Sequence, residues 1–575
     1  MTSDNLWTLF GAAAIMALVA WLSWLKTRGT AEDRDGYFLA GRGLTGLFIA
    51  GSMLLTNLSA EQLIGLNGSA YAFNMSAMAW EVTAGFAIIV MALVFLPRYL
   101  AGGYTTLPEF LSSRFDEGVR RYTVVLFLLG YGLVTIPSVL YSGALAVLGM
   151  FDVQGVTGLG PTASLVAVIL LIGCVGGAYA VFGGLKAVAV SDTINGIGLL
   201  IIGFLVPVFG LVALGEGSFT QGATTVFTTE THKLNAIGSN DDPTPFLTLF
   251  TGMIFATLFY WGTNQYVIQR TLGAKSLAEG QKGVLLTGFL KLLVPGMMLL
   301  PGIIAFHLYG PDIGGLDKAY PRLVADVLPG WMSGFFLAVL LGAVFSSFNS
   351  LLNSAATLFA LDIYAPLYAK KRGGNVDDAT LVKTAKIASL FIAVASFIAA
   401  PFLQNAAEGL WQIIRIFSGF YNIPVIAIVL AGLFMRGVPP WAAKAVILFH
   451  VAAYGALRFI PAFDTGLNFV HLYAILFFIE IGFMAALAKG FGGVDIAHEN
   501  IRHPVELTPW RYAGPVSIIL VAAIVAIYLL FSPVGLVNGL SALFWPSLTG
   551  LMGLTVLAIA LERGRWMRKN RERRI

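Results

Sequence analysis

The sequence predicts an all-α polytopic membrane protein, and its composition, apolar segments and charge distribution support this. Of its 575 residues, 57% are hydrophobic and 11% are charged, whereas about a quarter of the residues of a soluble domain are charged. The mean hydropathy is +0.82. A spanning helix needs about 20 apolar residues, and roughly fifteen segments meet that length.

These apolar segments are short of charge and are separated by brief polar stretches. They predict 14–15 transmembrane helices. The segments lie at about 6–25, 43–72, 76–97, 122–149, 163–183, 190–214, 246–270, 283–309, 331–364, 385–403, 408–434, 438–459, 467–488, 513–532 and 541–562.

Basic residues fall mainly in alternate connections and in the tail after Glu562. Because cytoplasmic loops are enriched in Lys and Arg, we expect the N-terminus outside and the C-terminus in the cytoplasm. Arg270 is expected to be one of the charges of a cytoplasmic loop. The net charge of +5 is then a signal of topology, and a nucleic-acid partner is not expected. The first segment has neither a basic leader nor a cleavage site, so it is expected to be a retained helix.

The order of the segments suggests an internal repeat. Segments two to six (about 43–214) and seven to eleven (about 246–434) form two runs of five, and an odd number inverts the second run relative to the first. Inverted five-helix repeats are the plan of LeuT-like transporters. One N-terminal helix and about four C-terminal helices (435–575) would be peripheral within a single transporter domain, 1–575.

Polar residues interrupt the first helix of each run. The stretch 56–62, Thr-Asn-Leu-Ser-Ala-Glu-Gln, predicts a broken helix whose carbonyls could bind sodium; a polar face packed within the bundle is the alternative. The stretch 257–265 places Tyr260 and Trp261 beside hydroxyls and amides, which suits a sugar but also an interfacial aromatic belt.

A third polar stretch lies in segment 331–364. Ser346, Asn349, Ser350 and Asn353 follow helical spacing and form one stripe. Their oxygens suit weak sodium binding, but small hydroxyl residues also pack helices together.

Charged residues at hydrocarbon depth are costly and usually functional. Glu81, Asp192, Lys291, Arg415 and Glu480 lie within or beside apolar segments. Glu81 and Lys291 could pair simply to make their burial tolerable. Asp192 could instead be an N-terminal cap after Gly183-Gly184.

The motifs resemble the sodium/solute symporter family, in particular the sodium–glucose (galactose) cotransporters and their bacterial branch. The resemblance covers nearly the whole chain, and the order and spacing of the motifs make it specific. The motifs are Tyr37-Phe38-Leu39-Ala40-Gly41-Arg42, Asn57 to Gln62, Trp80-Glu81, Tyr104 to Phe110, Gly183-Gly184-Leu185, Tyr260-Trp261, Asn264-Gln265, Gln269-Arg270, Leu290-Lys291-Leu292, Pro301-Gly302, Ser346-Ser347, Leu352-Asn353-Ser354 and Asp362-Ile363-Tyr364.

The resemblance implies a role for each matching position. It implies that the sugar is bound by Asn57, Gln62, Glu81 and Lys291, with Tyr260 as a stacking inner gate and Thr257 and Trp261 nearby. It implies one sodium ion on the carbonyls of Leu55, Leu58 and Ala343 and the hydroxyls of Ser346 and Ser347. In some members a second sodium ion is held by positions matching Asp192, Ser346, Asn349 and Ser350, although Asn349 here replaces a hydroxyl.

Arg415 departs from the family pattern, since sugar carriers usually have a glutamine there. A guanidinium at this position would favour a carboxylated or sulfonated sugar, or it would pair with an internal carboxylate such as Glu408, or it would face the pore entrance.

The expected function is sodium-coupled import of a sugar, a hexose such as galactose or glucose, through the bacterial inner membrane by alternating access. Na⁺ is the coupling ion, and the lipid bilayer and a small solute are the other partners. An acidic sugar, polyol or carboxylate is the alternative solute, and a solute sensor with a transporter fold is a further alternative. An enzyme is not expected, because the sequence lacks metalloprotease, phosphate-loop and nucleophile motifs.

Overall fold

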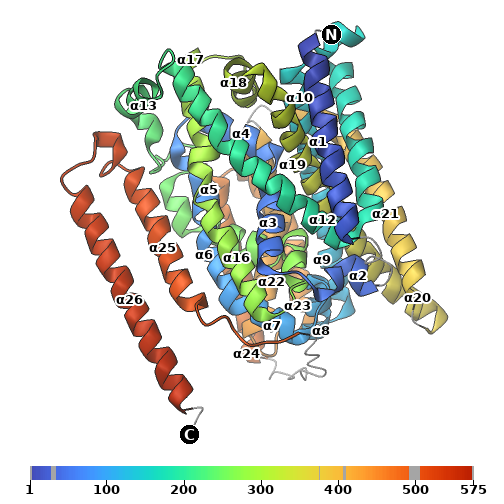
Figure 1. The fold of residues 1–575 in the computed structure, drawn as a ribbon. Helices are drawn as coiled ribbons and strands as arrows, with labels where there is room; N and C mark the ends of the chain where they lie inside the picture. The colour runs from blue at the N-terminus through green and yellow to red at the C-terminus, as the bar shows by residue number, and fades with distance from the viewer. Residues whose placement is uncertain (1–2, 28–33, 375, 406–409, 491–504, 573–575) are drawn as a thin grey trace.

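The computed structural model describes residues 3–27, 34–374, 376–405, 410–490 and 505–572, and these form a bundle of helices (Figure 1). In the described part of the chain, ten helices are long and apolar enough to cross a membrane. Two bent helix pairs and three shorter apolar helices accompany them. Together they account for every apolar segment expected from the sequence, so the all-α polytopic architecture is confirmed.

The first run of helices begins with a bent pair and continues through helices interrupted by π-type turns. Its members are α3 (Gly46–Asn57) with α4 (Ala60–Ala72), α5 (Ala79–Val82) with α6 (Ala84–Val90) and α7 (Leu96–Gly102), α9 (Glu117–Gly130) with α10 (Ile136–Met150), and α12 (Pro161–Leu214).

The second run repeats this order. Its members are α14 (Gly252–Gly262) with α15 (Gln265–Leu272), α16 (Leu277–Lys291) with α17 (Leu300–Tyr309), α19 (Gly330–Thr357) with α20 (Ala365–Arg372), α21 (Asp378–Ala399) and α22 (Leu410–Phe434). The short helices that join the spans are α2 (Arg34–Leu39), α8 (Leu107–Arg114), α11 (Val153–Thr157), α13 (Phe219–Thr228) and α18 (Ala319–Val327).

Helix α12 contains two of the expected segments. It is one helical run of 54 residues, and its apolar parts are Pro161–Gly177 and Val188–Leu214. Because about 20 residues span a bilayer, a run of this length is too long for a single crossing.

Five further helices surround the two runs, namely α1 (Ser3–Thr27), α23 (Pro440–Phe459), α24 (Phe469–Gly490), α25 (Ala513–Leu530) and α26 (Phe544–Glu572). Helix α25 packs closely on the bundle, where the side chains of Leu520 and Ile524 lie against Gly288 and Gly85. Helix α26 lies outside α25 (Figure 1), and only 6% of its apolar window is buried. An apolar helix so exposed is suited to contact with lipid.

Buried hydrogen bonds attach α23 and α24 to α22. His450 of α23 lies 2.6 Å from Glu480 of α24, through Nδ1 and Oε1, and 3.1 Å from the Gly419 carbonyl through Nε2. Tyr454 and Tyr473 donate to the carbonyls of Ile416 and Arg415. The peripheral helices therefore hold the backbone of α22 in place.

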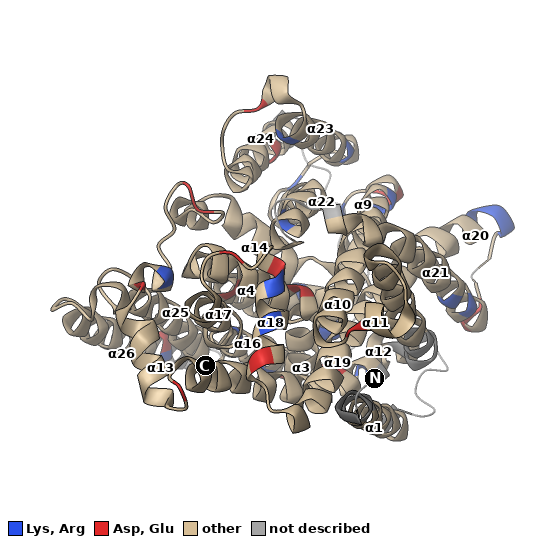
Figure 2. Cartoon of the chain, turned by 90° about the horizontal axis from the view of Figure 1, so that it is seen from above, with Lys and Arg blue, Asp and Glu red and all other residues tan. Residues whose placement is uncertain are grey.

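Charged residues are few along the bundle. Seen from above, most of the ribbon is uncharged, and the basic colour is prominent at the end of α20 (Figure 2), whose last turn holds Lys370, Lys371 and Arg372. Helix α1 begins at the end of the bundle where α13 and α18 lie, whereas α26 ends at the opposite end (Figure 1). An odd number of crossings would produce this arrangement.

Candidate functional site

The first helix of the first run is broken where the sequence predicted. Helices α3 and α4 meet at 57°. Of the two residues between them, Leu58 forms a tight turn, with ψ of 86° and a 3.1 Å bond from the Ser59 amide to the Asn57 carbonyl, and Ser59 is extended, with ψ of −178°. In a continuous helix the Ser59 amide would bond the Leu55 carbonyl, so the break leaves this carbonyl open to other partners inside the bundle.

The first helix of the second run is broken as well. Helix α14 ends at Gly262 and α15 begins at Gln265, and the amides of Thr263 and Asn264 both bond the Phe259 carbonyl at 2.9 Å. The Asn264 side chain accepts a hydrogen bond of 2.5 Å from the Tyr131 hydroxyl. Tyr260 and Trp261 lie in the last turn of α14, inside the bundle, so an interfacial aromatic belt is excluded for this pair.

Helix α19 faces the first break with its hydroxyl stripe. The Ser347 hydroxyl lies 3.4 Å from the Leu55 carbonyl, and the hydroxyls of Thr56 and Ser350 are 3.4 Å apart. Leu58 and Ala343 are fully buried on either side. Carbonyl and hydroxyl oxygens from two elements therefore converge, and such oxygens are the ligands that hard cations take.

Asp192 lies deep within α12, between α3 and α19. Its carboxylate accepts hydrogen bonds from the hydroxyls of Ser52, at 2.6 Å, and Ser346. The alternative that Asp192 caps a helix is wrong, because α12 begins thirty-one residues earlier, at Pro161. Asp192 instead links α3 and α19.

The expectation that Arg270 is a charge of a cytoplasmic loop is wrong. Its side chain is fully buried, and its guanidinium donates to the hydroxyls of Ser52, at 3.2 Å, and Ser350, and to the Tyr266 carbonyl. Arg270 lies in α15, and every residue of this helix is buried. A fixed cation thus lies among the residues expected to hold a second sodium ion.

The residues expected to bind the sugar form one cluster. Glu81 accepts hydrogen bonds from Lys291 and, at 3.2 Å, from Gln62. Lys291 also donates to the Asn57 side chain, whose amide donates to the Tyr260 hydroxyl at 2.9 Å. Glu81 and Lys291 are 2% and 1% exposed. Four elements, α3–α4, α5, α14 and α16, are joined here.

A small enclosed cavity of about 10 Å³ lies at the centre of this cluster. That is about the space that one water molecule needs, so the side chains must part to admit a pyranose. The Thr257 hydroxyl is engaged with its own helix, at 2.9 Å from the Met253 carbonyl. Trp80 and Ala256 were not expected as site residues. The lining residues are Asn57, Trp80, Glu81, Ala256, Thr257, Tyr260, Trp261, Lys291 and Arg415.

Arg415 reaches this cavity from α22. Its guanidinium carbon lies 3.9 Å from the centre of the Trp411 ring and 4.7 Å from that of Trp80. Its NH2 atom is 3.9 Å from a Glu81 oxygen. Glu408, the partner considered for it from the sequence, lies outside the described residues.

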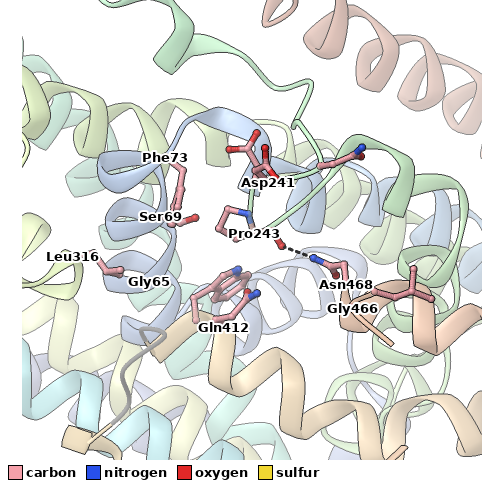
Figure 3. Close-up of a pocket in the computed structure, with 13 residues that line it drawn as sticks. Gly65, Ser69, Phe73, Asp241, Pro243, Leu316, Gln412, Gly466 and Asn468 are labelled. Carbon is pink, nitrogen blue, oxygen red and sulfur yellow. Dashed lines mark hydrogen bonds between the residues drawn. The ribbon is translucent and has the colours of Figure 1, made fainter. Parts of the chain in front are cut away.

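A much larger cavity, of about 530 Å³, lies nearby at the end of the bundle where α13 and α18 are found. Figure 3 shows Ser69 and Phe73 of α4 on one side, with Gln412 of α22 below and Asp241 of a connecting loop above. Trp411 also lines it, and this ring borders Arg415 of the small cavity. The two cavities are therefore separated by the stack of Trp411, Arg415 and Trp80.

Two broken helices, a hydroxyl stripe and a buried polar cluster between them define a transport protein of the LeuT-like class, not an enzyme. The comparison with known families agrees with this. A family model described as the sodium:solute symporter family matches residues 37–439, and the chain belongs to that family.

Two curated relatives are similar along nearly all of their length. The Escherichia coli (strain K12) protein called uncharacterized symporter YidK is 44% identical over 518 residues, covering 89% of this chain and 88% of the relative. The sodium/glucose cotransporter of Vibrio parahaemolyticus is 30% identical over 511 residues, covering 84% of this chain and 90% of that protein.

Solved structures share the fold. A Na⁺-coupled sialic acid symporter in an outward-open, substrate-bound state superposes with a TM-score of 0.71 at 22% identity, covering 86% of this chain and all of that one. The LeuT-like architecture expected from the two runs of helices is therefore confirmed.

Proposed function

We propose that this protein imports a hexose-sized sugar, driven by the entry of one sodium ion, across the bacterial inner membrane. The N-terminus lies outside and the C-terminus in the cytoplasm, so the 530 Å³ cavity opens to the outside. Residues of about 43–214 and 246–434 form the two inverted repeats, and about 435–575 are peripheral. The relatives named for sodium and glucose support this proposal, as does the basic tail.

One observation carries the proposal, namely that the break between α3 and α4 contributes residues both to the proposed sodium site and to the solute cluster. Leu55, on one side of the break, faces Ser347 at 3.4 Å through its carbonyl. Asn57, two residues later, is bonded to Lys291 and, at 2.9 Å, to Tyr260 in the solute cluster. A cation that fixes this segment also fixes Asn57, and this shared segment provides the coupling.

The sodium ion would be held by the carbonyls of Leu55, Leu58 and Ala343 and the hydroxyls of Ser346 and Ser347. Sodium entering from outside would draw α19 onto the break and order the solute cluster. On inward opening, α19 would leave the break and Tyr260 would move aside to release the sugar.

A single sodium ion is proposed because of Arg270. The expected ligands of a second ion were Asp192, Ser346, Asn349 and Ser350. Arg270 already donates to Ser350, and its fixed charge would repel a second cation. The Asp192 carboxylate is engaged by Ser52 and Ser346. With a neutral sugar, the sodium ion carries one net charge inward and gains about 2.3 kcal/mol in a potential of 100 mV, which at about 1.4 kcal/mol per tenfold supports roughly 50-fold accumulation.

The test is uptake by the purified full chain in proteoliposomes, with an inward sodium gradient and a radiolabelled panel of neutral and acidic sugars. The expected result is accumulation that needs sodium, carries one net charge with each neutral sugar and none with each singly acidic sugar, and is not sustained by lithium or protons alone. Binding without accumulation, or uptake indifferent to sodium, would contradict the proposal.

A further inference from the structure

The guanidinium of Arg415 lacks a hydrogen-bond acceptor in the described part of the chain. Its Nε is buried without a partner, and its side chain is 14% exposed. The ion pair that it forms with Glu81 is loose, at 3.9 Å. A buried charged donor without an acceptor is costly, and such a group is usually completed by a ligand or an ion.

The carboxylate of Glu81 is already used by other groups. One of its oxygens accepts from Lys291, and the oxygen nearest Arg415 accepts from Gln62 at 3.2 Å. Lys291 therefore supplies the close counter-charge of Glu81. Among the described residues, Arg415 has only the loose contact with Glu81 and an electrostatic interaction with the carboxylate of Glu61, neither of which is a hydrogen bond. Asp241 and Asp242 of the larger cavity form no ion pair with it among the described residues, and Asp242 is bound by Ser239 and Asn74.

The position of Arg415 is fixed, so its donors are preorganised. The guanidinium lies over the rings of Trp411 and Trp80, and these contacts hold it in position. Its own carbonyl accepts from Tyr473 at 2.5 Å and from Ser418 at 3.1 Å. A planar guanidinium held this way presents paired N–H groups that match the two oxygens of a carboxylate or sulfonate, whereas a neutral hydroxyl offers one oxygen.

We propose that the transported sugar is acidic, with its ring against Tyr260 and a carboxylate or sulfonate on the carbon outside the ring bound by Arg415. This inference rests on the proposed function and narrows its substrate. The anionic group would lie at the boundary between the two cavities, where it would replace the loose contact with Glu81. Binding of the anionic group would draw Trp411, Arg415 and Trp80 closer together. This stack separates the solute cluster from the larger cavity.

The test compares D-galactose with D-galacturonate, which differ only at C6, in the sodium-driven proteoliposome assay. The expected KM of the unaltered protein is at least tenfold lower for galacturonate. Arg415→Gln should abolish this preference while retaining galactose uptake. Arg415→Lys should keep part of the preference, because lysine retains the positive charge but lacks the paired N–H groups of the guanidinium. Arg322→Gln removes an exposed guanidinium from α18 and serves as the matched control with unchanged preference.

If the unaltered protein takes up galactose and its KM for galacturonate is equal or higher, this inference is overturned and the proposed function stands. An equal rise of both KM values in Arg415→Gln would also overturn it, since that would assign Arg415 to closure of the cavity. Absence of sodium-driven uptake for either sugar would overturn both proposals. The comparison in the unaltered protein does not depend on the folding of any variant.

Discussion

Replacing Ser347 with alanine tests the proposed sodium site most directly. The side chain is 1% exposed, and its hydroxyl lies 3.4 Å from the Leu55 carbonyl at the break in the first core helix. Alanine removes one oxygen from the group that would hold the cation and changes the packing little. We therefore expect the affinity for sodium to fall while the fold persists.

The size of the effect follows from the burial of this group. A hydrogen bond to a charged group contributes about 1.5–3 kcal/mol, and a bond between a hydroxyl and a cation is comparable in kind. At about 1.4 kcal/mol per tenfold, the sodium concentration for half-maximal uptake should rise about 10- to 150-fold. At physiological sodium, uptake would then be nearly lost.

The assay is sodium-dependent uptake in proteoliposomes, with thermal unfolding in detergent to check the fold. Ser142→Ala is a matched control, because Ser142 is equally buried and its hydroxyl bonds the Val139 carbonyl of its own helix at 2.9 Å. An unchanged sodium dependence in Ser347→Ala, at normal uptake, would refute the assignment of this residue to the ion.

Three further substitutions probe the clusters around this site. Gln62→Ala should weaken sugar affinity far more than sodium affinity, measured by uptake; equal effects would place Gln62 in the fold alone. Lys291→Met should lower stability by about 3–5 kcal/mol because Glu81 is left buried and unpaired, and adding Glu81→Gln should recover part of the loss in thermal unfolding. Glu480→Gln should cost about 1–3 kcal/mol through His450 with sodium dependence unchanged; a shifted sodium dependence would contradict its role as an attachment of α22.

The sequence located the break in the first core helix well because polar residues at hydrocarbon depth are rare. The run from Thr56 to Gln62 interrupts an otherwise apolar helix, and the structure breaks at Leu58 and Ser59 within it. The residues expected to contact the sugar line one cavity or bond to it, since Gln62 reaches the cavity through Glu81. Their roles in binding stay predictions.

Two charged groups have partners that are distant in sequence. A helix cap was the alternative to a sodium-ligand role for Asp192, but its partners Ser52 and Ser346 lie 140 and 154 residues away. Arg270 follows an apolar segment, where a basic residue usually marks the cytoplasmic side, and its acceptor Ser350 lies 80 residues away. Local sequence could not reveal these bonds.

The sequence by itself determined that this chain enters a membrane as a helical bundle, because the transfer of apolar segments into lipid depends on their length and composition. Only the tertiary structure decided which buried charges balance one another, because in a low-dielectric interior that depends on distances of a few ångströms between helices. It paired Glu81 with Lys291, placed Arg270 among hydroxyls, and left the Arg415 guanidinium without a hydrogen-bond acceptor among the described residues, at the boundary of two cavities.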